Sequence, residues 1–135
     1  MEELMLEAKD ENLGIVQDFI EKEVGPYAYP PEKMIVLQIA VEEIFVNISH
    51  YAYNPDTGPA TIRVEVLEDP LAVELTFFDN GIPYDPLAKA DPDITLDADE
   101  RAIGGLGIYM VKQSMDDVTY EYKDGQNILT IRKLL

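Results

Sequence analysis

Cysteine and tryptophan are absent from the 135 residues of this chain, and histidine occurs only once. The lack of cysteine excludes disulfides and thiolate metal sites. Basic residues are also scarce: 10 lysines and arginines stand against 27 acidic residues, which gives a formal net charge of −17. This charge argues against direct binding of nucleic acid, because neutralising phosphates requires clusters of lysine and arginine. It argues equally against binding to an anionic membrane surface.

No uninterrupted apolar run reaches the length of a membrane span. The first residues, Met-Glu-Glu-Leu, lack the basic stretch and apolar core of a signal peptide. We therefore expect a cytoplasmic protein, and the acidic charge suits a basic protein partner. The length predicts a single domain over residues 1–135, with 47% hydrophobic residues to fill one core.

Apolar periodicity predicts eight elements in the order β-α-α-β-β-α-β-β. The expected strands are residues 3–8, 60–67, 71–78, 118–122 and 128–132, and the expected helices are residues 11–24, 31–53 and 108–115. Asp10 is expected to cap the first helix, and Lys123-Asp124-Gly125 to turn the last hairpin. Adjacent hairpins predict a mainly antiparallel mixed sheet with helices on one face, which is an α+β two-layer sandwich.

A first motif, Glu43-x-x-x-Asn47, lies in the second predicted helix. Its two side chains share a helix face, and the rest of the helix is mostly apolar, so buried polar groups there need partners. An amide oxygen can join ATP phosphates around magnesium, and a carboxylate one turn away can deprotonate an attacking hydroxyl. A polar stripe facing water is the alternative for this pair, and it is the interpretation that we adopt for Glu42.

A second motif, Asp79-Asn80-Gly81 followed by Ile82-Pro83-Tyr84-Asp85-Pro86, comes where a predicted strand ends. The Asp79 carboxylate can accept a hydrogen bond from the exocyclic amine of adenine, and a following glycine lets the backbone approach the base. Asp-Asn-Gly is also a hairpin-turn signal. The prolines after it disfavour a second strand, and both interpretations stay open at this point.

A third motif, Gly104-Gly105-Leu106-Gly107, precedes the last predicted helix at Ile108. Backbone N–H groups at a helix start bind anions, and glycines permit a close approach. The alternative is a flexible loop before an ordinary helix. The motif is not a Walker A loop, because the Gly-Lys-Ser/Thr ending is missing.

Taken together, the three motifs, with Ala52-Tyr53 behind the first, resemble those of the GHKL ATPase superfamily of gyrase, the heat-shock chaperone, histidine kinases and MutL. Within it, the chain is similar to bacterial anti-sigma factors that are also serine kinases. The resemblance covers nearly the whole chain and implies a Bergerat-type ATP-binding fold. It makes Glu43 the catalytic base, Asn47 the magnesium ligand and residues 87–103 a lid over ATP. The positions it assigns to nucleotide binding are Asn47, Asp79, Gly81, Gly104, Gly105, Leu106 and Gly107.

The resemblance further implies an ATP-dependent serine/threonine-protein kinase that uses ATP, leaves ADP and requires Mg²⁺. Such a protein phosphorylates a serine on a small anti-anti-sigma antagonist and otherwise sequesters a sigma factor. The family is often dimeric, which makes a homodimer a further candidate assembly. The alternative function is an ATP/ADP-binding partner-switch protein without phosphotransfer, but such a module needs no base at Glu43. A sensor histidine kinase fragment ranks third, because 135 residues leave no space for its phosphoacceptor helix pair.

The chain departs from the family pattern at three places. The family usually has a histidine four residues after the asparagine, where this chain has Tyr51, and His50 falls one residue early. We therefore expect His50 to make a local polar contact and not to act as a catalyst. Gln126-Asn127 replaces a threonine that often helps to hold the base. The expected lid is acidic, which suits a triphosphate only if most of those side chains point to solvent.

Overall fold

A computed structural model describes residues 1–88 and 105–135 of the chain. Its strands are β1 (Glu2–Glu7), β2 (Pro59–Leu67), β3 (Ala72–Asp79), β4 (Asp117–Lys123) and β5 (Gln126–Leu134). Its α-helices are α1 (Leu13–Val24), α2 (Pro31–Asn47) and α3 (Gly105–Ser114). The elements follow one another in the predicted order β-α-α-β-β-α-β-β.

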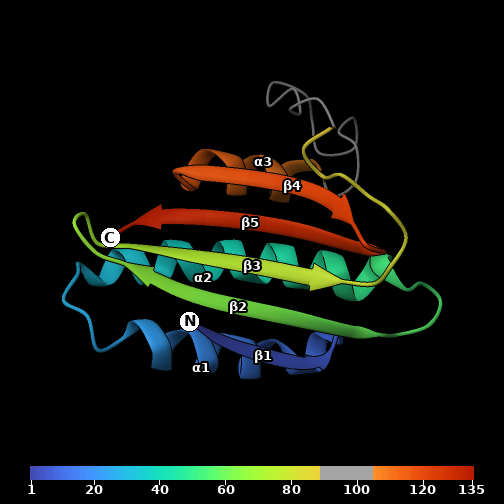
Figure 1. Cartoon of the computed structure of the whole chain (residues 1–135), viewed down its shortest axis with the longest axis horizontal. Coiled ribbons are helices and arrows are strands. Elements are labelled where there is room, and N and C mark those ends of the chain that lie inside the picture. The colour runs from blue at the N-terminus through green and yellow to red at the C-terminus, as the bar shows by residue number, and fades with distance from the viewer. Residues whose placement is uncertain (89–104) are drawn as a thin grey trace.

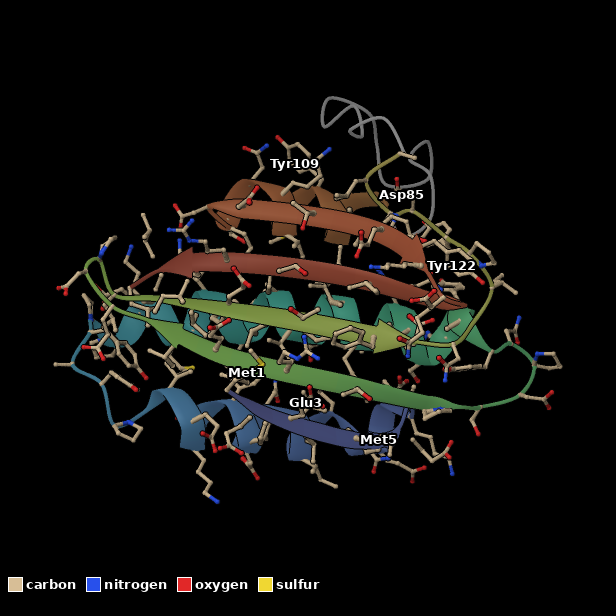
Figure 2. The ribbon with its side chains drawn as sticks, viewed as in Figure 1. Met1, Glu3, Met5, Asp85, Tyr109 and Tyr122 are labelled. Atoms are coloured by element: carbon tan, nitrogen blue, oxygen red, sulfur yellow. The ribbon has the colours of Figure 1, made fainter. Side chains whose placement is uncertain are left out.

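The strands form one sheet in the order β1-β2-β3-β5-β4, and all four pairings among the described residues are antiparallel. Figure 1 shows the three helices together behind this sheet, so they cover one of its faces. Along β2, the buried residues Ala60, Ile62 and Val64 alternate with more exposed ones, as expected for a sheet with one covered face. Glu3 and the exposed Met5 lie along the edge strand β1 (Figure 2). The predicted α+β sandwich is confirmed.

Helix α2 supplies much of the hydrophobic core. Its residues Leu37, Val41 and Phe45 are fully buried, and both other helices contact it. The continuous helical segment Pro31–Ala52 is long and apolar enough, by length and composition, to cross a membrane, and it is the one such segment among the described residues. In this fold the buried residues of α2 belong to the hydrophobic core, and α2 packs beside α1 and α3 in the helical layer.

The last hairpin turns at the predicted place, but over two residues, because Lys123 belongs to β4 and pairs with Gln126. Asp124 and Gly125 both have positive φ angles, 54° and 77°, which is the backbone of the tight turn that Asp-Gly favours. The turn fixes the register between β4 and β5, in which Tyr122 faces Asn127. On the other side of β5, Asn127 is paired with Asp79 at the end of β3.

The prediction that Asp10 caps the first helix is wrong. A short 3₁₀ turn, Asp10–Asn12, precedes α1, and the side chain of Asp10 makes no capping hydrogen bond. Its Oδ2 atom instead lies 2.6 Å from Nε2 of His50. His50 belongs to a π-helical turn, Ile48–Ala52, that continues α2, so a partner 40 residues away outweighs the local capping preference.

Candidate functional site

A cavity of about 520 Å³ opens beside the C-terminal end of α2. The end of β3 and the end of α2 lie at the same end of the molecule (Figure 1). Apolar lining comes from Ile44, Ile48, Phe77, Pro86, Ile108 and Leu129. Polar lining comes from Asn47, Tyr51, Asn54, Asp79, Tyr84, Tyr120 and Asn127. An apolar slot of this size with a few polar groups is typical of a small-molecule site.

Asp79 is the last residue of β3 and is only 6% exposed. Its Oδ1 atom accepts hydrogen bonds of 2.9 Å from the Gly81 N–H and from Nδ2 of Asn127. Burial raises the pKa of the Asp79 carboxyl, and these two donors oppose that shift. The strand end therefore presents a largely desolvated carboxylate whose orientation is fixed by neighbouring groups.

The turn after Asp79 rests on the π-helical turn that continues α2. A Cβ atom at Gly81 would overlap the carbonyl of Ala52, and the Ile82 N–H donates to that carbonyl at 3.1 Å. Glycine at position 81 is thus required by a close approach of two backbones. No hairpin follows Asp79 among the described residues, because the partners of β3 are β2 and β5, so the hairpin interpretation of Asp-Asn-Gly is wrong.

Tyr53 links the same turn to β2. Its hydroxyl donates to the Pro59 carbonyl at 2.6 Å and accepts from the Asn80 N–H at 2.7 Å. Desolvation raises the pKa of Tyr53, which keeps the hydroxyl protonated and able to donate. The structure thus gives Ala52-Tyr53, part of the family resemblance, a definite role under the Asp79 turn.

The first and third motifs meet between α2 and α3. Asn47 ends α2 and lines the cavity, while Glu43 lies one turn earlier and is not among the lining residues. A Cβ atom at Gly107 would overlap Oε2 of Glu43. The first turn of α3 therefore packs directly on the Glu43 carboxylate, and a side chain at position 107 would require that carboxylate to move.

Parts of the predicted site lie outside the described residues. These are Gly104 and residues 89–103 of the expected lid. Gly105 begins α3, so its backbone belongs to the first helical turn, as a phosphate cradle requires. Leu106 lies in the same turn. Asp85 belongs to the segment that leads from β3 towards this region (Figure 2), and its carboxylate accepts from the Leu87 N–H at 2.8 Å.

Sequence reasoning did not assign Tyr51, Tyr84, Tyr120 or Asn127 to the site, although all four line the cavity. In the sequence, Asn127 stands out only because Gln126-Asn127 replaces a threonine of the family pattern. The Asp-Gly turn signals only the pairing of Asn127 with Tyr122, whereas the pairing of Asn127 with Asp79 depends on the register of β5 against β3, for which the sequence carries no local signal. His50 makes a polar contact, as predicted, but its partner is Asp10, 40 residues away in the sequence.

Among residues 1–88 and 105–135, no group of three or more histidine, aspartate or glutamate side chains could hold a metal ion by itself. The amide oxygen of Asn47 is the polar group of α2 that lines the cavity. A magnesium ion here would therefore depend on Asn47, water and ligand phosphates, which agrees with how this ion is usually bound.

The site combines a buried carboxylate at a strand end, an apolar slot, and a helix whose first turn packs on a second carboxylate. A family described as "Histidine kinase-like ATPase domain" matches residues 6–133. The chain belongs to this family.

Individual relatives agree with this assignment. The chain is 28% identical over 131 residues to "Serine-protein kinase RsbW" of Bacillus mycoides, covering 94% of this chain and 81% of the relative. It is 30% identical over 95 residues to "Serine/threonine-protein kinase BtrW" of Bordetella bronchiseptica, covering 70% and 66% of the two chains. A histidine kinase domain of Erythrobacter litoralis has the same fold, with a TM-score of 0.54 and 16% identity, over 93% of this chain and 60% of that one.

Proposed function

We propose that the protein is an ATP-dependent serine/threonine kinase and anti-sigma factor. It would phosphorylate a serine of a small anti-anti-sigma antagonist and sequester a sigma factor when not so engaged. The observation that carries the proposal is that Asp79 and Asn47 line one cavity, while Glu43, one helical turn before Asn47, contacts the first turn of α3. The similarity to serine-protein and serine/threonine-protein kinases supports the kinase class.

Adenine would occupy the apolar part of the cavity, and its exocyclic amine would donate a hydrogen bond to Asp79. Gly81 would act indirectly, because its N–H donates to Asp79 and its missing side chain lets this turn pack against Ala52. Guanine carries a carbonyl oxygen in place of this amine and would set an acceptor against the carboxylate. The site is therefore expected to prefer adenine nucleotides over guanine nucleotides.

The phosphates would lie towards the start of α3, where N–H groups of the first turn are available. The packing of Gly107 on Glu43 brings that turn close to the end of α2. Asn47 would hold magnesium through its amide oxygen. When bound, magnesium would neutralise part of the negative charge that develops on the transferred phosphoryl group.

Glu43 would act as the general base. The serine oxygen of the antagonist forms a bond to the γ-phosphorus, the bond from that phosphorus to the bridging oxygen breaks, and ADP leaves. The Glu43 carboxylate takes the hydroxyl proton. The contact of Glu43 with the first turn of α3, where the phosphates are expected, supports this role.

A second candidate function is nucleotide-dependent partner switching without phosphotransfer. The specific observation in its favour is that Glu43 does not line the cavity, whereas Asn47 and Asp79 do. In this alternative, ATP and ADP would stabilise different partner complexes, and no phosphate would reach the antagonist.

Transfer of labelled γ-phosphate to candidate antagonist proteins separates the two functions. The wild type should label a serine, and Glu43→Ala should bind nucleotide but transfer phosphate roughly 10²–10⁴-fold more slowly, the usual contribution of a positioned base. Glu42→Ala is the matched control, because Glu42 neighbours Glu43 and is exposed. Equal transfer by the wild type and Glu43→Ala would contradict the assignment of the base.

A further inference from the structure

We propose that Asn127 is a positioning residue for nucleotide recognition: its amide fixes the Asp79 carboxylate and thereby sets the preference for adenine. The inference rests on the proposed ATP site and assigns it a residue that the family resemblance left without a role. Asn127 is buried at 7% exposure, lines the cavity, and stands opposite Asp79 in the register of β3 and β5.

The orientation of the Asn127 amide is determined by its four partners. Its Oδ1 atom accepts from the Tyr84 N–H at 3.1 Å and from the Tyr120 hydroxyl. Its Nδ2 atom donates to Oδ1 of Asp79 and to the Ile82 carbonyl, both at 2.9 Å. A flipped amide would face the Tyr84 N–H with another donor, and Asp79 and Ile82 with another acceptor, so the observed orientation is strongly preferred.

This orientation decides which oxygen of Asp79 remains for a ligand. Both donors to Asp79, the Gly81 N–H and the Asn127 amide, use Oδ1. Within the described residues, no donor reaches Oδ2. The carboxylate is therefore held through one oxygen, and the other is left as the acceptor for the exocyclic amine of adenine.

The same amide also fixes the segment that follows the Asp79 turn. It holds the carbonyl of Ile82 and the N–H of Tyr84, and both of these residues line the cavity. The Asn127 side chain thus holds both the Asp79 carboxylate and two residues of the cavity wall. Removing the Asn127 amide should therefore change the preference for adenine over guanine, which a general loss of packing would not do.

The electrostatic consequence concerns the ionisation of Asp79. Burial raises the pKa of Asp79, and the Asn127 amide and the Gly81 N–H lower it. The titratable groups that interact with Asp79 from neighbouring elements are Tyr53, after α2, and Tyr120, on β4. Both tyrosine pKa values are raised, mainly by desolvation, so both stay neutral near pH 7.

Asn127→Leu is the direct test, because leucine keeps the approximate volume and removes both polar atoms. ADP and GDP binding to the full chain should be measured by calorimetry between pH 5 and 8. We expect ADP binding about 10- to 100-fold weaker at pH 7, as for loss of a hydrogen bond to a charged group. We also expect a smaller ratio of ADP to GDP affinity, and half-maximal binding at a higher pH.

Thr76→Val is the matched control. Thr76 lies on β3 with Asp79 and is similarly buried. Its hydroxyl accepts one hydrogen bond of 3.4 Å from the Thr130 hydroxyl. This variant should change neither the nucleotide preference nor the pH at half-maximal binding. Asn127→Thr serves as a second variant if Asn127→Leu does not fold, and one remaining hydroxyl donor should make its effects intermediate.

A carboxyl NMR titration of Asp79 without nucleotide gives an independent measurement. The midpoint should move to higher pH in Asn127→Leu or Asn127→Thr and stay in place in Thr76→Val. Unchanged midpoint and unchanged nucleotide preference in the Asn127 variants would overturn this inference alone. Equal weakening of ADP and GDP binding without a pH shift would also overturn it, and a wild type that binds no ADP would overturn it together with the proposed function.

Discussion

At the scale of single residues, Asp79 shows a conflict between folding and ligand recognition. A buried carboxylate costs stability unless it is well paired, and burial raises the pKa of Asp79 above its ordinary value of 3.8 despite two hydrogen bonds. The folded state therefore binds the Asp79 proton more tightly than the unfolded state does. The contribution of this group to stability is most favourable below pH 3.8 and declines as the pH rises through the folded-state pKa.

Asp79→Asn should therefore separate stability from binding. Near pH 7 the nucleotide-free variant should be at least as stable as the wild type, because a desolvated charge is removed. Its stability advantage should shrink as the pH falls towards 4. Urea unfolding at several pH values measures this, and a wild type that gains stability relative to the variant as the pH rises would contradict the assigned sign. ADP binding by the variant should weaken by about 10-fold or more.

Gly107 gives a second prediction at this scale. A Cβ atom there would overlap the carboxylate of Glu43, so Gly107→Ala should displace the general base. Phosphotransfer should fall, by up to the roughly 10²–10⁴-fold expected when the base is lost. Alanine favours a helix over glycine by about 1 kcal/mol, so stability should fall little or not at all.

The control for Gly107→Ala is Gly14→Ala in α1, where a Cβ atom would meet nothing within 4 Å. This control should gain stability and keep full phosphotransfer. Phosphotransfer assays and thermal unfolding of the two variants provide the comparison. Undiminished transfer by Gly107→Ala would show that Glu43 does not need its observed position.

At the scale of elements, the π-helical turn Ile48–Ala52 and Tyr53 support the turn after β3. Tyr53→Phe removes the hydroxyl that bridges the Asn80 N–H and the Pro59 carbonyl, while the ring can still pack beside Gly58. We expect a loss of about 1–3 kcal/mol in the free energy of unfolding, together with weaker ADP binding. Urea unfolding and calorimetry measure the two effects.

The control for this position is Tyr122→Phe. Tyr122 is exposed at the end of β4 (Figure 2) and does not line the cavity. This variant should leave stability and ADP binding close to those of the wild type. If Tyr53→Phe behaved in the same way, the bridge would not support the turn.

The elements were predictable where local sequence dictates them. Asp124-Gly125 set a two-residue turn through its positive φ angles, and period-2 alternation located the strands. The failure of Asp10 to cap the first helix was not predictable, because its partner His50 comes close only after the chain has folded. The role of Asn127 could not be predicted without the register of three strands. The contact between Glu43 and Gly107 could not be predicted without the packing of α2 on α3. The motifs thus indicated the ligand class, while the contacts that hold them depend on tertiary structure.

At the scale of the whole molecule, the net charge of −17 produces a strong negative field around a small domain. A basic sigma factor would be drawn towards it by long-range steering. Its association rate constant should fall as salt rises from about 0.05 to 0.5 M, because charges are screened beyond about 10 Å at 0.1 M. Stopped-flow association at both salt concentrations measures this, and a rate independent of salt would leave the charge without a role in partner binding.

We propose that the cavity between α2, β3 and α3 binds adenine nucleotides through Asp79. Calorimetric titration of the wild type and Asp79→Asn with ADP and GDP, in the presence of magnesium, is the decisive measurement. The wild type should bind ADP more tightly than GDP, and Asp79→Asn should lose most of this preference. Equal affinity of the wild type for ADP and GDP, or an unchanged preference in Asp79→Asn, would contradict it.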